Sequence, residues 1–242
     1  MILAIETATP RCSIALAEGG VVLAETVLPE GKQSSETLLP AAAALFKSRG
    51  ISPEALSCVA VSAGPGSFTG LRVGMASAKG FCFGWGLPIA LVPTLEALAH
   101  RFPGEERLLL PVMDARKKEV YSAVFKWEAG ELLRLSPDMA VSPASLPDCL
   151  PQEEQVVLFG DGLASYGAML LDRLGDRASF ESGPKGLPSA GMVGVLGERI
   201  FLSGAAGNCQ TAVPSYIRPS EAEFMRLEPR SRRSELPPKH PI

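Results

Sequence analysis

The sequence predicts an α/β protein made of two similar halves, each a mixed sheet with helices on its faces. In each half a short apolar run ends in an acid, at residues 2–6 and again at 108–114, and strands then alternate with helices. The chain has 242 residues and is 46% apolar, which is enough for two small cores. We expect an N-terminal domain of residues 1–104, a C-terminal domain of 105–218 and a flexible tail of 219–242.

Three strands are expected at the start of the first half. Residues 2–6 form an apolar run, and residues 11–17 and 21–27 alternate between two faces. Gly19 and Gly20 separate the two alternating runs, and a Gly-Gly pair in this position is a strong hairpin signal. A hairpin followed by right-handed crossovers predicts a mixed sheet.

A helix is expected at residues 36–49, although Pro40 removes one hydrogen bond near its start. The apolar residues of one face recur at helical spacing: Leu38, Ala42, Leu45 and Phe46.

The first half continues with a strand at 58–63, which leads through a Gly-Pro-Gly-Ser loop into a helix at about 70–83. Thr69 is the expected N-cap of this helix, because its hydroxyl can accept a hydrogen bond from a free amide. Another strand at 88–92 and a helix at 94–101 complete the half.

The second half repeats this order. We expect strands at 108–113, 119–126, 132–136 and 156–159, and helices at 163–174 and 190–201. Residues 213–218 are expected to close the second domain or to return to the first.

Composition excludes several classes of protein. The 23 basic and 26 acidic residues nearly cancel, so no overall field attracts this chain to nucleic acid or to an acidic membrane. The most apolar stretch, residues 80–93, is too short for a membrane span. Five scattered cysteines fit neither a disulfide framework nor a zinc site, so a reduced, cytoplasmic setting is expected.

The histidine inventory argues against catalysis by this chain. His100 and His240 are 140 residues apart, which argues against an imidazole metal site and a Ser-His-Asp triad. We therefore expect no catalytic residues and no metal ligands.

Five segments in a fixed order carry a resemblance to a known family. They are ILAIETAT at 2–9, SETLLP at 35–40, VSAGPGSFTGLRVG at 61–74, DARKKEVY at 114–121 and VPSYIR at 213–218. Over about residues 1–223 the chain resembles the bacterial TsaB (YeaZ) family, a branch of the actin, sugar-kinase and heat-shock-70 superfamily. Two positions depart from that family, which usually has Asp in place of Glu6 and His in place of Ser34. The longer Glu6 side chain argues against a metal-phosphate role there.

The resemblance implies a duplicated actin-like (ASKHA, ribonuclease H-like) fold and a part in forming N6-threonylcarbamoyladenosine at position 37 of tRNA. It implies a non-catalytic scaffold that binds and activates a TsaD-type threonylcarbamoyl transferase, together with a TsaE-type ATPase, and that meets tRNA only indirectly. An actin-like ATPase or kinase is the alternative, and a peptidase is a weaker one.

A weak nucleotide site is one interpretation of two glycine- and threonine-rich segments, since a helix N-terminus attracts phosphate. The candidate residues are Thr7, Thr9, Gly64, Gly66 and Ser67. The loop lacks the Lys-Ser/Thr pair of a Walker A motif, so its glycines alternatively serve only a tight turn. No cofactor of its own is expected, and ATP or ADP could bind at the interface of the complex.

A partner surface is the second hypothesis, because the helix at 70–83 is apolar nearly all round and the helix at 36–49 has a second face of small residues. Either the two helices pack only on each other, or they dock the same helix pair of a partner as a four-helix bundle. The second interpretation predicts a heterodimer with TsaD and a homodimer of the isolated chain. The expected interface residues are Glu36, Leu39, Pro40, Ala43, Gly70, Arg72, Val73, Gly74, Ser77 and Phe81.

Overall fold

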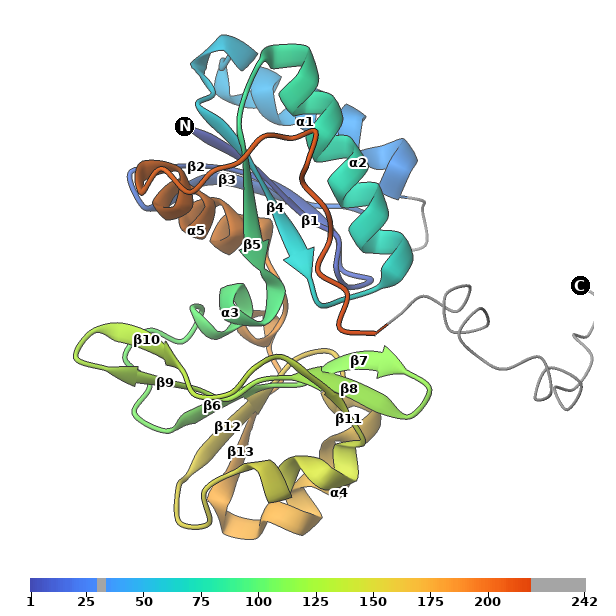
Figure 1. The fold of residues 1–242 in the computed structure, drawn as a ribbon, viewed down its shortest axis with the longest axis vertical. Helices are drawn as coiled ribbons and strands as arrows, with labels where there is room; N and C mark the ends of the chain where they lie inside the picture. Colours follow the sequence, from blue (N-terminus) through green and yellow to red (C-terminus); the bar gives the residue numbers. More distant parts are fainter. Residues whose placement is uncertain (30–33, 219–242) are drawn as a thin grey trace, which may run out of the picture.

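The first domain is built on a five-stranded sheet, as the computed structural model of the chain, which describes residues 1–29 and 34–218, shows (Figure 1). The strand order is β3-β2-β1-β4-β5, with β1 antiparallel to β2 and parallel to β4. The strands are β1 (Ile2–Glu6), β2 (Ser13–Glu18), β3 (Val21–Val27), β4 (Cys58–Gly64) and β5 (Ile89–Pro93). All five lie within one or two residues of the predicted strands.

A second five-stranded sheet repeats this plan in the order β10-β9-β6-β12-β13. Its strands are β6 (Leu108–Pro111), β9 (Phe125–Glu128), β10 (Glu131–Arg134), β12 (Val156–Phe159) and β13 (Ala178–Glu181). The central strand β6 is antiparallel to β9 and parallel to β12, as β1 is to β2 and β4. The two sheets therefore match strand for strand, and the predicted duplicated actin-like fold is confirmed.

The second domain also contains a small third sheet that the sequence pattern did not predict. It has the order β11-β8-β7 and consists of β7 (Met113–Arg116), β8 (Glu119–Ser122) and β11 (Met139–Val141). The strands predicted at 108–113 and 119–126 are each divided between two sheets. The first division follows Pro111, which has no amide hydrogen to continue a ladder. The second falls where Val124 bonds to residues 135 and 136.

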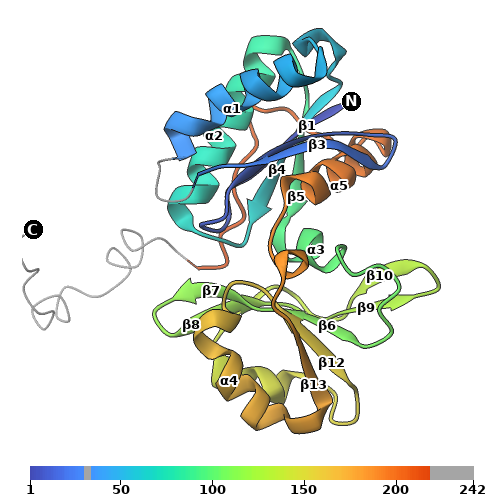
Figure 2. The ribbon, with the colours of Figure 1, turned by 180° about the vertical axis from the view of Figure 1, so that it is seen from behind.

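Helices cover both faces of the first sheet. On one face lie α1 (Ser34–Arg49) and α2 (Phe68–Trp85), side by side, and on the other lies α5 (Ala190–Leu202) (Figures 1 and 2). The short α3 (Thr94–Ala99) lies between the domains, and α4 (Leu163–Leu174) covers the second sheet. Short 3₁₀ turns span Pro53–Ala55, Pro143–Cys149, Gly175–Arg177 and Pro184–Gly186. Among the described residues, no helix is both long enough and apolar enough to cross a membrane.

The N-cap of α2 differs from the prediction. The helix begins at Phe68, and the Ser67 hydroxyl accepts a hydrogen bond from the Gly70 amide at 3.3 Å. Thr69 lies inside the first turn, so Ser67 rather than Thr69 caps the helix.

The position of α5 corrects the predicted domain of residues 105–218. This helix packs on β1, β2, β4 and β5 of the first sheet rather than on the second sheet. Gly191, Gly194 and Gly197 line one side of α5, and a Cβ atom at 194 would lie 2.8 Å from the Ala17 Cβ. Small residues on both surfaces thus let the helix lie unusually close to this sheet.

After α5, residues 203–218 run back along the first domain, and we call them the return segment (Figure 1). Gly207 pairs with Ile89 at the edge of β5, and the Ser215 amide donates to the Ala63 carbonyl at 2.7 Å. Arg218 then forms an ion pair with Glu119 of β8. Residues 213–218 were expected either to close the second domain or to return to the first. They return to the first domain, and Arg218 also links the segment to the second domain. The predicted tail of 219–242 lies outside the described residues.

A matched pair of glycine substitutions tests the packing of α5. Gly197→Ala is expected to destabilise the protein by about 1–3 kcal/mol, because the new methyl group would overlap the Ala60 side chain. Gly80→Ala, on the exposed side of α2 with open space around it, is expected to stabilise by about 0.5–1 kcal/mol. Urea unfolding of both variants measures the difference. Equal effects would mean that α5 does not pack closely on the sheet in solution.

Candidate functional site

The two segments predicted to face a phosphate lie against each other. Thr7–Thr9 follow β1, and the loop of residues 64–67 begins at Gly64, the last residue of β4. The Ser67 amide donates to the Ala8 carbonyl at 2.7 Å, and the Thr7 hydroxyl donates to the Gly70 carbonyl at 2.8 Å. The structure therefore brings the two predicted segments together and joins them by hydrogen bonds, with Thr7 and Thr9 buried and Ser67 exposed.

The glycines of this loop are required by close backbone approach. A Cβ atom on Gly66 would lie 2.6 Å from the Ala8 Cβ, and one on Gly64 or Gly70 would overlap the carbonyl of Ser215 or Thr7. Gly64 also has a φ of +123°, which side chains rarely tolerate. These contacts account for the glycines by packing alone. Weak nucleotide binding stays a prediction.

Three amides at or near the start of α2 are engaged by the protein. The Gly70 amide donates to Ser67 Oγ, the Ser67 amide donates to Ala8, and the Ala8 amide donates to Glu6 Oε1 at 2.6 Å. A phosphate would have to displace these partners.

Glu6 is a buried carboxyl group at the end of β1, only 1% exposed. Its Oε2 atom has no hydrogen-bond partner. Burial raises the pKa of Glu6 to about 7, and the Ala8 amide and the Ser62 hydroxyl only partly oppose this. The negative charges of Glu25 and Asp161 raise the pKa slightly further. This carboxyl group therefore titrates near neutral pH and is enclosed by the protein.

The acidic and basic residues at 114–121 form a structured hairpin turn. Asp114 Oδ1 accepts a hydrogen bond from the Arg116 amide at 2.8 Å, and residues 116–118 all have positive φ. Glu119 pairs with Arg218 of the return segment. The cluster thus orders its own turn and holds the end of the return segment. Among residues 1–29 and 34–218, no group of three or more His, Cys, Asp or Glu side chains is placed to hold a metal ion.

The outer faces of α1 and α2 form an exposed surface of apolar and small residues. We call it the helix-pair surface, and its members are Leu39, Pro40 and Ala43 of α1 and Arg72, Ala76, Gly80 and Phe83 of α2, all exposed. Leu39 is 63% exposed and Phe83 is 80% exposed. Nothing in the described part of the chain covers these two large apolar side chains.

Two of the predicted interface residues are not on this surface. Gly74 is buried, because its Cα lies against the Thr7 side chain, and Phe81 is buried, because its ring stacks on Trp85 with the centroids 4.9 Å apart. Gly70, Val73 and Ser77 are half-buried. Of the remaining predicted residues, Glu36, Leu39, Pro40, Ala43 and Arg72 are exposed.

The sequence pattern missed Ala76, Gly80 and Phe83, which continue the exposed stripe that begins at Arg72. Their spacing of three or four residues places them one above another on the helix. This spacing shows that the residues share one side of α2. Because α2 is apolar on nearly every side, the sequence alone did not show that this side faces outward.

Arg72 joins the N-terminal end of this surface to the return segment. Its guanidinium lies 3.9 Å from the centroid of the Phe68 ring, and its Nε donates to the Tyr216 hydroxyl at 3.2 Å. The rings of Phe68 and Tyr216 are 5.0 Å apart. Side chains from two distant parts of the sequence therefore hold one another in place.

Comparison with protein families gives one match over most of the chain. Residues 9–166 match a family model described as "TsaD: tRNA N6-adenosine threonylcarbamoyltransferase". The tRNA threonylcarbamoyladenosine biosynthesis protein TsaB of Bacillus subtilis is 31% identical over 228 residues, which cover 94% of this chain and 98% of that protein. The protein of the same name from Escherichia coli is 38% identical over 128 residues, covering 52% of this chain and 54% of that protein.

Solved structures with a similar fold come from Pseudomonas aeruginosa. A crystal structure of an uncharacterized protein with similarity to peptidase YEAZ superposes with a TM-score of 0.77 and 25% identity, covering 90% of this chain and 99% of that one. A structure titled YeaZ superposes with a TM-score of 0.75 and 24% identity, covering 89% and 99%. The similarity thus extends over both domains.

The buried Glu6 makes stability depend on pH. Because its pKa is raised in the folded protein, the folded state binds the proton more tightly, so stability falls as pH rises from about 4.5 through about 7. Glu6→Gln removes the charge and is expected to abolish this loss, which amounts to about 3 kcal/mol by pH 8. Thermal unfolding at pH 5.5 and pH 8 measures the effect. Identical pH dependence in both proteins would contradict the assignment.

Proposed function

The chain belongs to the TsaB (YeaZ) family, and we propose that it is a non-catalytic scaffold that binds and activates a TsaD-type threonylcarbamoyl transferase in the formation of N6-threonylcarbamoyladenosine at tRNA position 37. The exposed helix-pair surface is the observation that carries this proposal. A TsaE-type ATPase joins the pair, tRNA contacts this chain only indirectly, and the complex works in the cytoplasm.

The composition of the helix-pair surface supports docking against other helices. Ala43, Ala76 and Gly80 have little or no side chain, so a partner helix can approach closely between the large side chains of Leu39 and Phe83. Apolar surfaces of more than a few hundred Å² are uncommon on monomers and mark interaction sites. A partner helix pair that covers this surface completes a four-helix bundle.

The similarity to the TsaD family model supports the choice of partner. Residues 9–166, which include α1 and α2, match this model, so a TsaD-type protein shares the plan of these elements. Two related helix pairs can meet about an approximate two-fold axis, as identical pairs do in symmetric dimers. The same geometry gives a homodimer when the chain is alone.

The hydrogen bonds within and between the loops after β1 and β4 support a scaffold rather than an ATPase. Ser67, Ala8 and Gly70 already use their amides within the protein. The function therefore depends on the outer surface of the first domain, and any ATP or ADP of the complex binds where the subunits meet.

Reconstitution with the cognate TsaD-type transferase tests the proposal directly. The chain is expected to form a stable complex with the transferase in gel filtration and to restore threonylcarbamoylation of tRNA in a mixture that also contains the TsaE-type ATPase. A transferase that is equally active without this chain would contradict the scaffold role.

A matched pair of substitutions locates the docking surface. Leu39→Arg places a charge in the helix-pair surface and is expected to weaken binding to the transferase at least tenfold, because the charge must be desolvated. Leu202→Arg at the end of α5, where leucine is 75% exposed on the opposite face of the sheet, is expected to change binding less than twofold. Isothermal titration calorimetry measures both, and equal losses would place the interface elsewhere.

Self-association of the isolated chain is a separate prediction. Light scattering is expected to give the mass of a dimer, and Gly80→Arg is expected to give a monomer, since the position is exposed and a long side chain there would separate the helices. Leu202→Arg again serves as the control. A dimer that survives Gly80→Arg would show that the chain pairs through another surface.

A further inference from the structure

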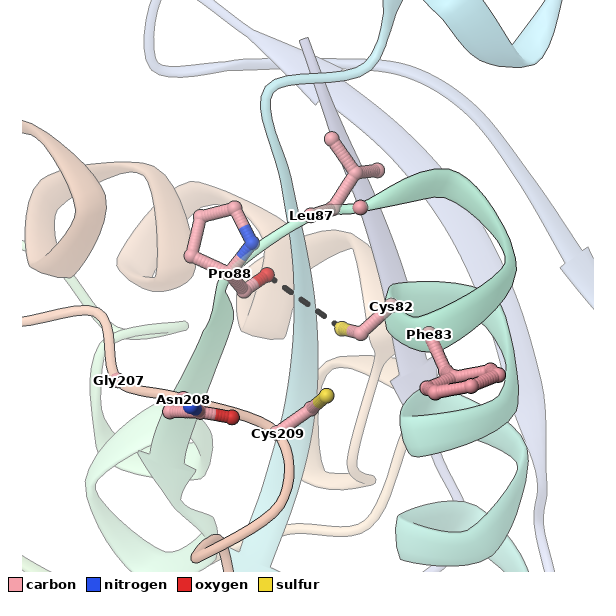
Figure 3. Close-up of a pocket in the computed structure, with 8 residues that line it drawn as sticks. Cys82, Phe83, Leu87, Pro88, Gly207, Asn208 and Cys209 are labelled. Carbon is pink, nitrogen blue, oxygen red and sulfur yellow. Dashed lines mark hydrogen bonds between the residues drawn. The ribbon is translucent and has the colours of Figure 1, made fainter.

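Two thiol groups that the proposed function does not use share an open pocket, which Phe83 of the helix-pair surface also lines. The pocket has a volume of about 380 Å³ and lies between the end of α2, the residues before β5 and the return segment. Figure 3 shows the sulfur atoms of Cys82 and Cys209 both directed into it, from α2 and from the return segment. Both cysteines are free thiols.

The return segment is fixed on both sides of Cys209. Before it, Gly207 pairs with Ile89, with N···O distances of 2.8 and 3.0 Å. After it, the Gln210 carbonyl accepts a hydrogen bond from Lys79 Nζ at 3.4 Å. Lys79 precedes Cys82 by nearly one helical turn. In the sequence Cys82 lies between Lys79 and Ile89. The contacts of the return segment to these two residues therefore hold Cys209 beside Cys82.

The two thiols differ in access and in chemistry. Cys82 is 1% exposed, and its sulfur donates to the Pro88 carbonyl at 3.4 Å. Burial raises the pKa of Cys82 to about 12, and the nearby Cys209 and Cys58 raise it further as charged neighbours. Cys209 is half-buried at the edge of the pocket. Cys209 is thus the thiol that a solvent-borne reagent meets first.

We propose that Cys82 and Cys209 form a reversible disulfide that fastens the return segment to the end of α2 when hydrogen peroxide is present. The Cys209 thiolate attacks one peroxide oxygen, an S–O bond forms and the O–O bond breaks, and the leaving hydroxide takes a proton to become water. Cys82 sulfur then attacks Cys209 sulfur, so that the S–S bond forms and the S–O bond breaks. The second hydroxide leaves as water with the Cys82 proton. Two thiols are oxidised and one peroxide is reduced to two waters.

The location of the pair gives the disulfide a structural consequence. Cys82 directly precedes Phe83 of the helix-pair surface, and Cys209 lies on the segment that reaches Arg72 and Glu119. The bond closes a loop of more than 100 residues, and such loops restrict the unfolded chain strongly. Oxidation is therefore expected to raise the melting temperature by roughly 5–10 °C.

Hydrogen peroxide treatment of the full chain tests the proposal. After alkylation of the remaining thiols and digestion, mass spectrometry is expected to find a peptide that links Cys82 to Cys209, and dithiothreitol is expected to remove it. Cys82→Ser is expected to leave Cys209 as a sulfenic acid that dimedone traps. The increase in melting temperature is expected in the natural chain and absent in Cys209→Ser.

Cys149 provides the control, because it is exposed and lies in the second domain. Cys149→Ser is expected to form the Cys82–Cys209 link as the natural chain does. Oxidation of Cys149 with no link between Cys82 and Cys209 would overturn the proposal, as would a melting temperature that rises equally in Cys209→Ser.

Discussion

The contact between the glycine side of α5 and the alanine-rich face of the first sheet is the constraint on which the rest of the structure depends. Gly194 and Gly197 lie on Ala17 and Ala60, so helix and sheet approach more closely than larger side chains would permit. Polar contacts fix the start of α5 as well, since the Ala190 amide donates to Ser13 Oγ and the Ser189 hydroxyl donates to Glu25. The chain must therefore leave the second domain and return to the first.

This return of the chain decides which surfaces stay open. With α5 on one face of the first sheet, α1 and α2 cover only the other, and nothing in the described residues lies over their outer sides. The return segment then fills the space beside Gly64 and Ala63 and helps to enclose the loops after β1 and β4. The packing of α5 thus brings the return segment against the loop after β4 and leaves the outer sides of Leu39 and Phe83 exposed.

Local features of the fold could be predicted from the sequence, and features that depend on distant residues could not. The hairpin at Gly19 and Gly20 and the limits of β12 and α4 follow from turn residues and from periodicity, which act within a few residues. The position of α5 depends on which of two sheets has the complementary small residues, and periodicity carries no such information. In the same way, Gly74 faces inward because Thr7, 67 residues earlier, occupies the space beside it.

In the candidate site, too, some features follow from nearby residues and others depend on residues far away in the sequence. The sequence was sufficient to predict that α1 and α2 have more apolar faces than one core requires, and the structure shows Leu39 and Phe83 exposed on their outer sides; that a partner covers them stays a prediction. It was not sufficient to assign the stripe of α2, because Phe81 has its partner, Trp85, within the same helix and in the core. Arg72 illustrates why the stripe matters: it is exposed, yet it is held by Phe68 and by Tyr216 of the return segment. A partner that docks on the outer side of α2 therefore also contacts the end of a segment whose next anchor, the pair of Arg218 with Glu119, lies in the second domain. Through these few side chains, docking on the first domain would be linked to the placement of the second, which gives the proposed scaffold a physical route by which a partner on α2 affects the second domain.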